Sequence, residues 1–160
     1  MQAGNVTTSS RRRGGLRGGR AGRPPGVPLG RELQVAELLR HIKHRRIPGT
    51  VWLTADVHDT SAQHHPLSRA ALKDFAPFRE FVTGPLHAGG FPAVKLDGTF
   101  GPEQPFAKAP ATANVPPGQD SQFFGEVAED AGGGEPTVRL HHEKGAVLFT
   151  KVLRPGRVGQ

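Results

Sequence analysis

Two side chains that can bind a metal ion follow a short apolar run near position 55. Asp56 and His58 lie two residues apart, directly after Thr50-Val51-Trp52-Leu53-Thr54-Ala55. If this run is a strand, residues two apart project from the same side of it. Ligands of open α/β sheets bind outside the carboxyl ends of strands, and a carboxylate with an imidazole suits iron, zinc or manganese. An ordinary polar loop entry has the same pattern, so the spacing alone leaves both interpretations open.

Five further histidines are candidates for a role in a site. The adjacent pair His64 and His65 lies in a polar stretch, where solvated loop positions are the favoured interpretation. His87 lies between glycine-rich segments and fits either an active-site wall or a structural hydrogen bonder. His141 and His142 lie on an expected strand far along the chain, and we expect them at the surface.

The elements before this pair predict half of an α/β unit. Residues 32–46 carry apolar side chains at i, i+3, i+4 and i+7, which predicts one helical stripe. Its members are Val35, Leu38, Leu39 and Ile42. Pro48 and Gly49 end the helix, and the apolar run 50–55 then predicts a central strand covered on both faces.

The remainder divides into an irregular part and a regular tail. We expect residues 58–75 to form a polar loop with a short helical turn near 68–73, and residues 76–120 to lack regular structure. Three β-prone segments then predict an antiparallel unit whose last two strands form a hairpin. These segments are Gln122–Glu129, Thr137–His142 and Ala146–Leu153.

The basic charge of the chain is concentrated at its start. Up to position 50 there are 11 Lys and Arg against 2 Asp and Glu, and after it 10 against 12. Residues 1–29 are rich in arginine, glycine and proline and hold no acid, which predicts a disordered leader. Such a leader could bind nucleic-acid phosphates nonspecifically, but it also fits translation of a GC-rich stretch in a shifted frame. We favour the second origin.

Compartment and membrane signals are weak. Ser9-Ser10 followed by Arg11, Arg12 and Arg13 hints at a twin-arginine export signal, but no apolar stretch follows. No run approaches 18 apolar residues, so no membrane span is expected. The default expectation is a cytoplasmic protein.

Several phrases of the sequence resemble the C-terminal part of a PhoD-like alkaline phosphatase of the calcineurin-like metallophosphoesterase superfamily. They run in family order from about Gly30 to Gly159: Gly30–Leu33, Val51–His58, Arg69–Gly89, Asp97–Pro102 and Gln122–Gly125. The resemblance implies that residues 30–160 form the end of the phosphatase domain. The expected fold is therefore α/β, a partial metallophosphoesterase sandwich of helix and buried strand, followed by an irregular segment and a small antiparallel β-unit.

The resemblance also implies an activity. Members of the family hydrolyse phosphate mono- or diesters with iron and calcium, which places Asp56 and His58 at the metal and His58 and His87 at the reacting phosphate. Two positions depart from the family pattern, Asp59 and Glu126, where an aromatic residue and a histidine are frequent. The family's earlier metal motifs are not found before Gly30, and the chain has no Cys and no Tyr. We therefore expect a truncated phosphatase that is inactive alone, with the missing N-terminal half as a possible partner.

Overall fold

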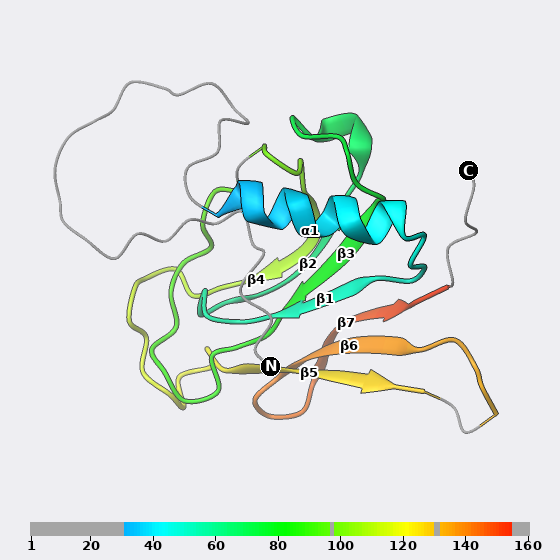
Figure 1. Cartoon of the computed structure of the whole chain (residues 1–160). Helices are drawn as coiled ribbons and strands as arrows, with labels where there is room; N and C mark the ends of the chain where they lie inside the picture. Colours follow the sequence, from blue (N-terminus) through cyan, green and yellow to red (C-terminus); the bar gives the residue numbers. More distant parts are fainter. Residues whose placement is uncertain (1–30, 97, 130–131, 155–160) are drawn as a thin grey trace, which may run out of the picture.

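The described residues fold into three layers, formed by one α-helix and two sheets. The computed structural model describes residues 31–96, 98–129 and 132–154, so the expected disorder of residues 1–29 lies outside it. Its elements are α1 (Glu32–His44), β1 (Val51–Thr54), β2 (Thr60–His65), a 3₁₀ turn (Leu67–Arg69), β3 (Phe78–Val82), β4 (Glu103–Lys108), β5 (Phe123–Ala128), β6 (Thr137–His142) and β7 (Val147–Val152). The helix lies on one face of the first sheet, and the second sheet lies on the other face (Figure 1). Within these residues no helix is long and apolar enough to cross a bilayer.

The predicted helix is confirmed, and its stripe packs on an aromatic core. Leu39 is buried, and Val35 and Ile42 pack beside it, whereas Leu38 is half-exposed at the edge of the stripe. The buried members of this core are Leu39, Trp52, Ala70, Phe75, Phe78 and Phe100. The burial of these aromatic rings under one face of α1 provides most of the free energy that holds the helix on the sheet.

Strand β1 forms where it was predicted, but the prediction of a central strand covered on both faces is wrong. The first sheet has the order β1-β3-β2-β4, so β1 is an edge strand among the described residues, and it pairs in parallel with β3. Trp52 and Thr54 are buried beneath α1, while Leu53 on the opposite face is 53% exposed. An apolar run of this length is therefore no proof of a doubly covered strand.

The segments expected to be irregular hold three of the seven strands, which corrects the sequence-based interpretation. Strand β2 lies between β3 and β4 and pairs antiparallel with both, although its sequence is polar. Strand β4 contains Pro105, which is tolerated because β4 forms the other end of the sheet. The predicted helical turn is a single 3₁₀ turn that begins at Leu67.

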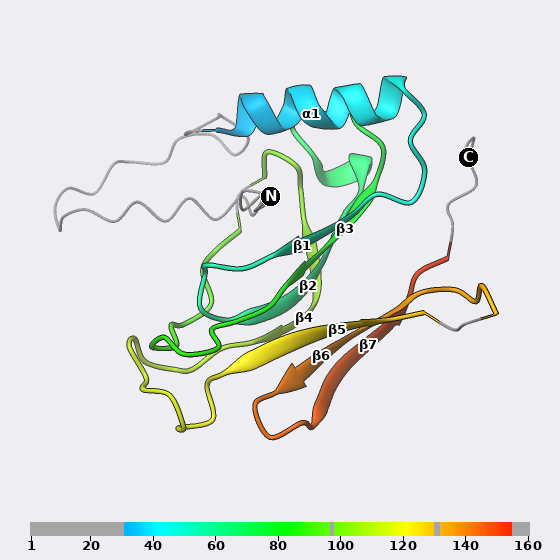
Figure 2. The same ribbon diagram turned by 60° about the horizontal axis from the view of Figure 1, so that its bottom comes forward.

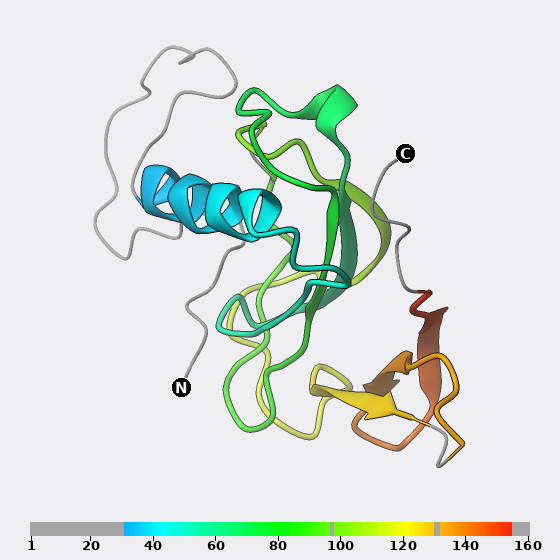
Figure 3. The same cartoon turned by 45° about the vertical axis from the view of Figure 1, so that its right-hand side comes forward.

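The small antiparallel unit at the end of the chain is confirmed as the sheet β5-β6-β7, with β6 and β7 as a hairpin. It packs against the first sheet through Ala62, Phe81, Val138 and Leu140. The rings of Phe106 and Phe149 stack at the margin of this contact, with centroids 5.3 Å apart. Figures 2 and 3 show the second sheet lying across the first on the side away from α1. The expected α/β class and the C-terminal β-unit are thus both correct.

Candidate functional site

Asp56 and His58 lie in a loop and not on the strand that precedes them. Strand β1 ends at Thr54, and the backbone φ angles of Asp56 and His58 are 81° and 62°. The inference that strand pleating places both side chains on one side is therefore wrong. Left-handed φ angles are uncommon outside glycine and cluster at ligand-binding and active sites. Val57 between them is buried, so both left-handed positions flank a residue anchored in the interior.

The ring of His58 is held by the loop that follows β3. Its Nδ1 lies 2.6 Å from the carbonyl oxygen of Gly89, and Phe91 donates its N–H to the His58 carbonyl over 3.1 Å. The Phe91 ring also makes an edge contact with the imidazole, with centroids 5.4 Å apart. Because a carbonyl oxygen can only accept, Nδ1 carries the proton, and Nε2 of the neutral ring keeps its lone pair. Metal-binding histidines are oriented by this kind of bond.

The loop that holds His58 is itself fixed by the second sheet. Gln122 donates from Nε2 to the Ala88 carbonyl over 3.1 Å, and the Phe123 N–H donates to the Pro85 carbonyl over 3.1 Å. A Cβ on Gly125 would lie 2.5 Å from the side chain of Thr83, so β5 approaches the end of β3 as closely as a glycine allows. The position of the His58 ring therefore depends on residues more than sixty positions further along the chain.

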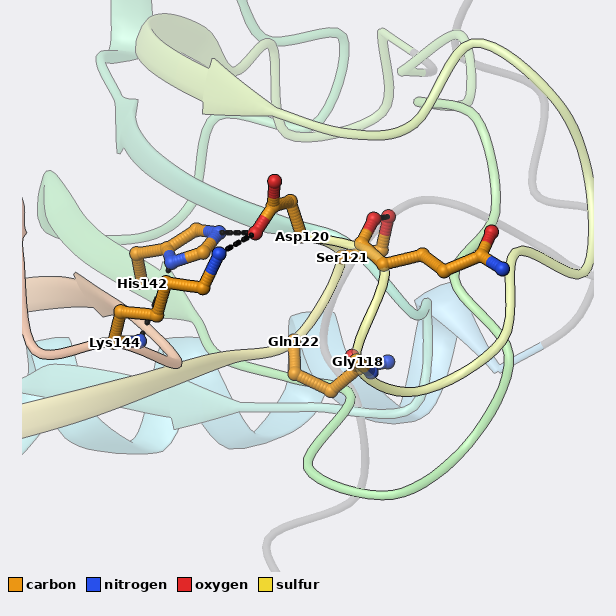
Figure 4. Close-up of polar contacts among 7 residues, drawn as sticks. Gly118, Asp120, Ser121, Gln122, His142 and Lys144 are labelled. Carbon is orange, nitrogen blue, oxygen red and sulfur yellow. Dashed lines mark hydrogen bonds and ion pairs between the residues drawn. The ribbon is translucent and has the colours of Figure 1, made fainter.

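Figure 4 shows how Gln122 and its neighbours are held in turn. The Gln122 side chain accepts the Gly118 N–H over 3.0 Å, while Asp120 lies 2.6 Å from Nζ of Lys144 and 3.7 Å from Nε2 of His142. The hydrogen bond from Lys144 holds the pKa of Asp120 below its ordinary value, and Asp120 raises the pKa of Lys144 in return. These contacts tie the β6–β7 turn to the segment before β5.

His87 lies near this site along the chain, two residues before Gly89. Its side chain is exposed, and within the described part of the chain it makes no hydrogen bond. Its role as a structural hydrogen bonder therefore has no support among the described residues, and both of its proposed roles stay predictions. Leu86 beside it is 75% exposed, so this end of the loop faces solvent.

The expectation of solvated loop histidines fails for the adjacent pair in β2. His65 is fully buried, with Nε2 3.3 Å from Oε2 of Glu80, and Thr54 donates to the other oxygen of Glu80 over 2.7 Å. The His65 ring stacks on Phe78 with centroids 4.2 Å apart. His64 is partly buried and lies 3.6 Å from Glu103. Sequence reasoning missed this network, although a glutamate inside the apolar run 78–82 was a usable signal.

The expectation that His141 and His142 lie at the surface is also wrong. His141 is stacked on Phe124 with centroids 4.7 Å apart, and its Nε2 lies 3.0 Å from Glu126. His142 makes an edge contact with Phe123. Both side chains are about nine-tenths buried, because flanking aromatic rings and carboxylates take the place of solvent.

The metal chemistry of the site is incomplete in the described residues. The Asp56 side chain is exposed and offers a carboxylate oxygen, and His58 offers Nε2. Metal sites in proteins use such atoms as ligands for iron, manganese, zinc and, for the carboxylate, calcium. Across residues 31–96, 98–129 and 132–154, however, no group of three or more His, Cys, Asp or Glu side chains is placed to hold a metal ion. Two donors do not make up such a site.

The fold and the site define a layered α/β domain in which an acid and an oriented histidine follow the end of a parallel strand. The family model for PhoD-like phosphatases matches residues 7–140, which is most of the chain. The chain therefore belongs to the PhoD-like phosphatase family. No curated protein and no solved structure matches its sequence.

Proposed function

We propose that this chain supplies part of the active site of a metal-dependent phosphoric-ester hydrolase. Asp56 and Nε2 of His58 would bind the metal and the phosphate, and His87 would line the site. The observation that carries the proposal is the bond between His58 Nδ1 and the Gly89 carbonyl, which leaves Nε2 as the only ring atom able to bind a ligand. The family membership supplies the class of reaction.

The number of ligands limits what the chain does alone. A metal held by two protein donors keeps most of its coordination positions for water, so its affinity and its position are both poor. We propose that the remaining ligands come from a further segment or a second chain, as in the family's complete metal centre. Iron and calcium are the metals that the family resemblance implies.

Metal binding can be tested without any assay of activity. Adding Mn²⁺ to the full 160-residue chain should broaden the NMR amide signals of residues near Asp56, His58 and Gly89 selectively. The variants Asp56→Asn and His58→Gln should each abolish the broadening, whereas the control His44→Gln, an exposed helix residue, should leave it unchanged. Uniform broadening, or broadening that both site variants retain, would show that these side chains are not metal ligands.

Activity is tested on bis-p-nitrophenyl phosphate with iron and calcium added. The full chain alone should give turnover close to the uncatalysed rate, because its described residues provide only two of the ligands. Robust turnover that disappears in Asp56→Asn would refute the need for further ligands while supporting the site. Robust turnover unaffected by Asp56→Asn would refute the site itself. The proposed role of the arginine-rich leader in nucleic-acid binding lies outside the described residues.

A further inference from the structure

A concave region lies at the opposite end of β1 and β3 from Asp56 and His58. It is a cleft of about 440 Å³, within the size range of small-molecule sites. One wall comes from the start of β1 and the start of β3, and the other from the segments that flank the second sheet at Pro136 and Leu153. Figures 1 and 2 both show the start of β1 and the end of β7 on the same side of the molecule.

The cleft contains a guanidinium without an acidic partner. Arg79 lines it from β3, is partly buried, and makes no hydrogen bond or ion pair with any described residue. By contrast, the two described arginines on or next to the second sheet are each paired. Arg139 lies 3.2 Å from Glu126, and Arg154 lies 3.3 Å from Glu135. A guanidinium carries five N–H donors in a planar fork, so Arg79 has binding capacity that none of the described residues uses.

The other polar groups in the cleft do not cancel this charge. His64 on β2 lies opposite Arg79 on β3. The carboxylate of Glu103 lies 3.6 Å from His64, so it is the partner of His64 and not of Arg79. The pKa of His64 is lowered, mainly by burial and next by the positive charge of Arg79. The contact with Glu103 acts in the opposite direction. The guanidinium of Arg154 lies at the opposite rim, where 82% of its side chain is exposed and Glu135 is its partner at 3.3 Å.

Apart from Gly49 and the polar side chain of Thr50, the remaining walls are apolar. They are formed by Pro48, Val51, Pro77, Phe78, Pro136 and Leu153. A highly hydrated inorganic anion would gain nothing from such walls, whereas a compact apolar group would be removed from water by them. The combination of one unpaired guanidinium with apolar walls is typical of sites for amphipathic anions.

We infer that this cleft binds a small organic anion, with its carboxylate or phosphonate group on the guanidinium of Arg79 and its apolar body between the two sheets. The planar fork of arginine can bind both oxygens of such a group. The cleft is separate from the loop that carries Asp56 and His58. Anion binding in the cleft therefore does not depend on whether the chain takes part in phosphoester hydrolysis.

Three probes of related shape separate charge from apolar contact. Benzoate carries both features, benzamide keeps the ring without the charge, and acetate keeps the charge without the ring. Each is titrated into the full chain while the emission of Trp52 is followed. Trp52 is the sole tryptophan, and its ring lies 6.1 Å from that of Phe78 in the cleft wall. Amide shifts of Val51, Phe78 and Arg79 locate the binding.

Benzoate should bind saturably, and benzamide and acetate should each bind at least about tenfold more weakly, as the loss of one charge-assisted contact or of the ring's burial predicts. Equal binding of benzoate and benzamide would overturn the proposal, because the cleft would then be merely apolar. The proposal would also be overturned if benzoate showed no saturable binding up to about 20 mM, a concentration well above a millimolar dissociation constant.

Variants assign the binding to Arg79. Arg79→Gln should weaken benzoate binding about tenfold or more, and Arg79→Lys should restore part of it because the charge returns without the fork. Lys95→Gln is the matched control, since it removes one positive charge from an exposed side chain outside the cleft. Equal effects of Arg79→Gln and Lys95→Gln would reduce the effect to net charge and overturn the assignment. The probe comparison on the unaltered chain decides the matter independently if a variant does not fold.

Discussion

At the scale of single residues, the most constrained group is the buried set formed by Thr54, His65 and Glu80. Its three members come from β1, β2 and β3, and all lie on the face of the sheet beneath α1. Glu80 and His65 have no exposed side-chain surface. Buried polar groups are retained only where partners compensate their lost hydration, so this set specifies how the three strands align.

Removing the carboxylate should therefore be costly. Glu80→Ala leaves the Thr54 hydroxyl and the His65 ring buried without their partner, and we expect it to lower the free energy of unfolding by about 3–5 kcal/mol. Glu103→Ala, which removes the half-exposed partner of His64, should cost at most about 1 kcal/mol. Urea unfolding followed by Trp52 emission measures both. Equal losses in the two variants would contradict the structural role assigned to Glu80.

Individual residues were also where sequence reasoning succeeded least. The chemistry of Asp56 and His58 could be read from their types, but the bond that orients His58 involves a backbone carbonyl of Gly89, which has no signature in a side-chain pattern. Similarly, His65 looked solvated because its partner Glu80 is distant in sequence. Pairing between distant residues is set by the fold, and a single sequence does not display it.

At the scale of elements, regular periodicity predicted helices and strands reliably, whereas a buried strand made of polar residues was not recognised from the sequence. Helix α1 and strands β5 to β7 follow simple patterns and formed where predicted. Strand β2 consists of Thr60-Ser61-Ala62-Gln63-His64-His65, in which the expected alternation of apolar and polar residues is absent. Its backbone is paired on both sides, and Thr60, Gln63 and His65 each make one side-chain hydrogen bond inside the protein. Tertiary context here outweighs the propensity of the residues.

The contact between α1 and the segment before β3 yields a pH-dependent prediction. Asp74 lies 2.8 Å from Nζ of Lys43 and 2.9 Å from Nε of Arg40, with His44 at 3.7 Å. The hydrogen bond from Lys43 is the main reason why the pKa of Asp74 lies below its ordinary 3.8. A depressed folded-state pKa stabilises the protein above the unfolded value, and this stabilisation is lost as the pH falls through the folded one.

Asp74→Asn should accordingly lower the melting temperature near neutral pH, and the difference from the unaltered chain should shrink once the pH falls below about 4. The effect should be small, because all the partners are exposed and screened by solvent. Thermal melts across this pH range provide the measurement, with Glu37→Gln on the same helix as the control. A difference that stays constant down to the lowest pH would mean that the charge of Asp74 is not the cause.

At the scale of the whole molecule, the two sheets share one core and should unfold together. Leu140 of β6 has no exposed surface and packs with Ala62 and Phe81 of the first sheet. The layers were predictable in kind from the order of helix, strand and hairpin. Their packing was not, because it depends on strands β2 and β4, which the sequence pattern concealed.

Leu140→Ala tests this shared core. We expect a loss of about 2–5 kcal/mol, with the transitions seen by Trp52 emission and by far-ultraviolet circular dichroism displaced together. Val127→Ala, at a half-exposed position in the neighbouring strand β5, should change little. If the Trp52 signal kept its original midpoint while the dichroism shifted, the first sheet would be stable without the second.

The bond between His58 and Gly89 also bears on the order in which the protein folds. It spans 31 residues, and the Gln122 side chain that fixes the same loop reaches back over another 34. Contacts between distant positions form late, since loop closure must precede them. We therefore expect the His58 ring to reach its final orientation only after residue 122 has been synthesised and β5 has docked. The candidate site would be among the last parts of the molecule to mature.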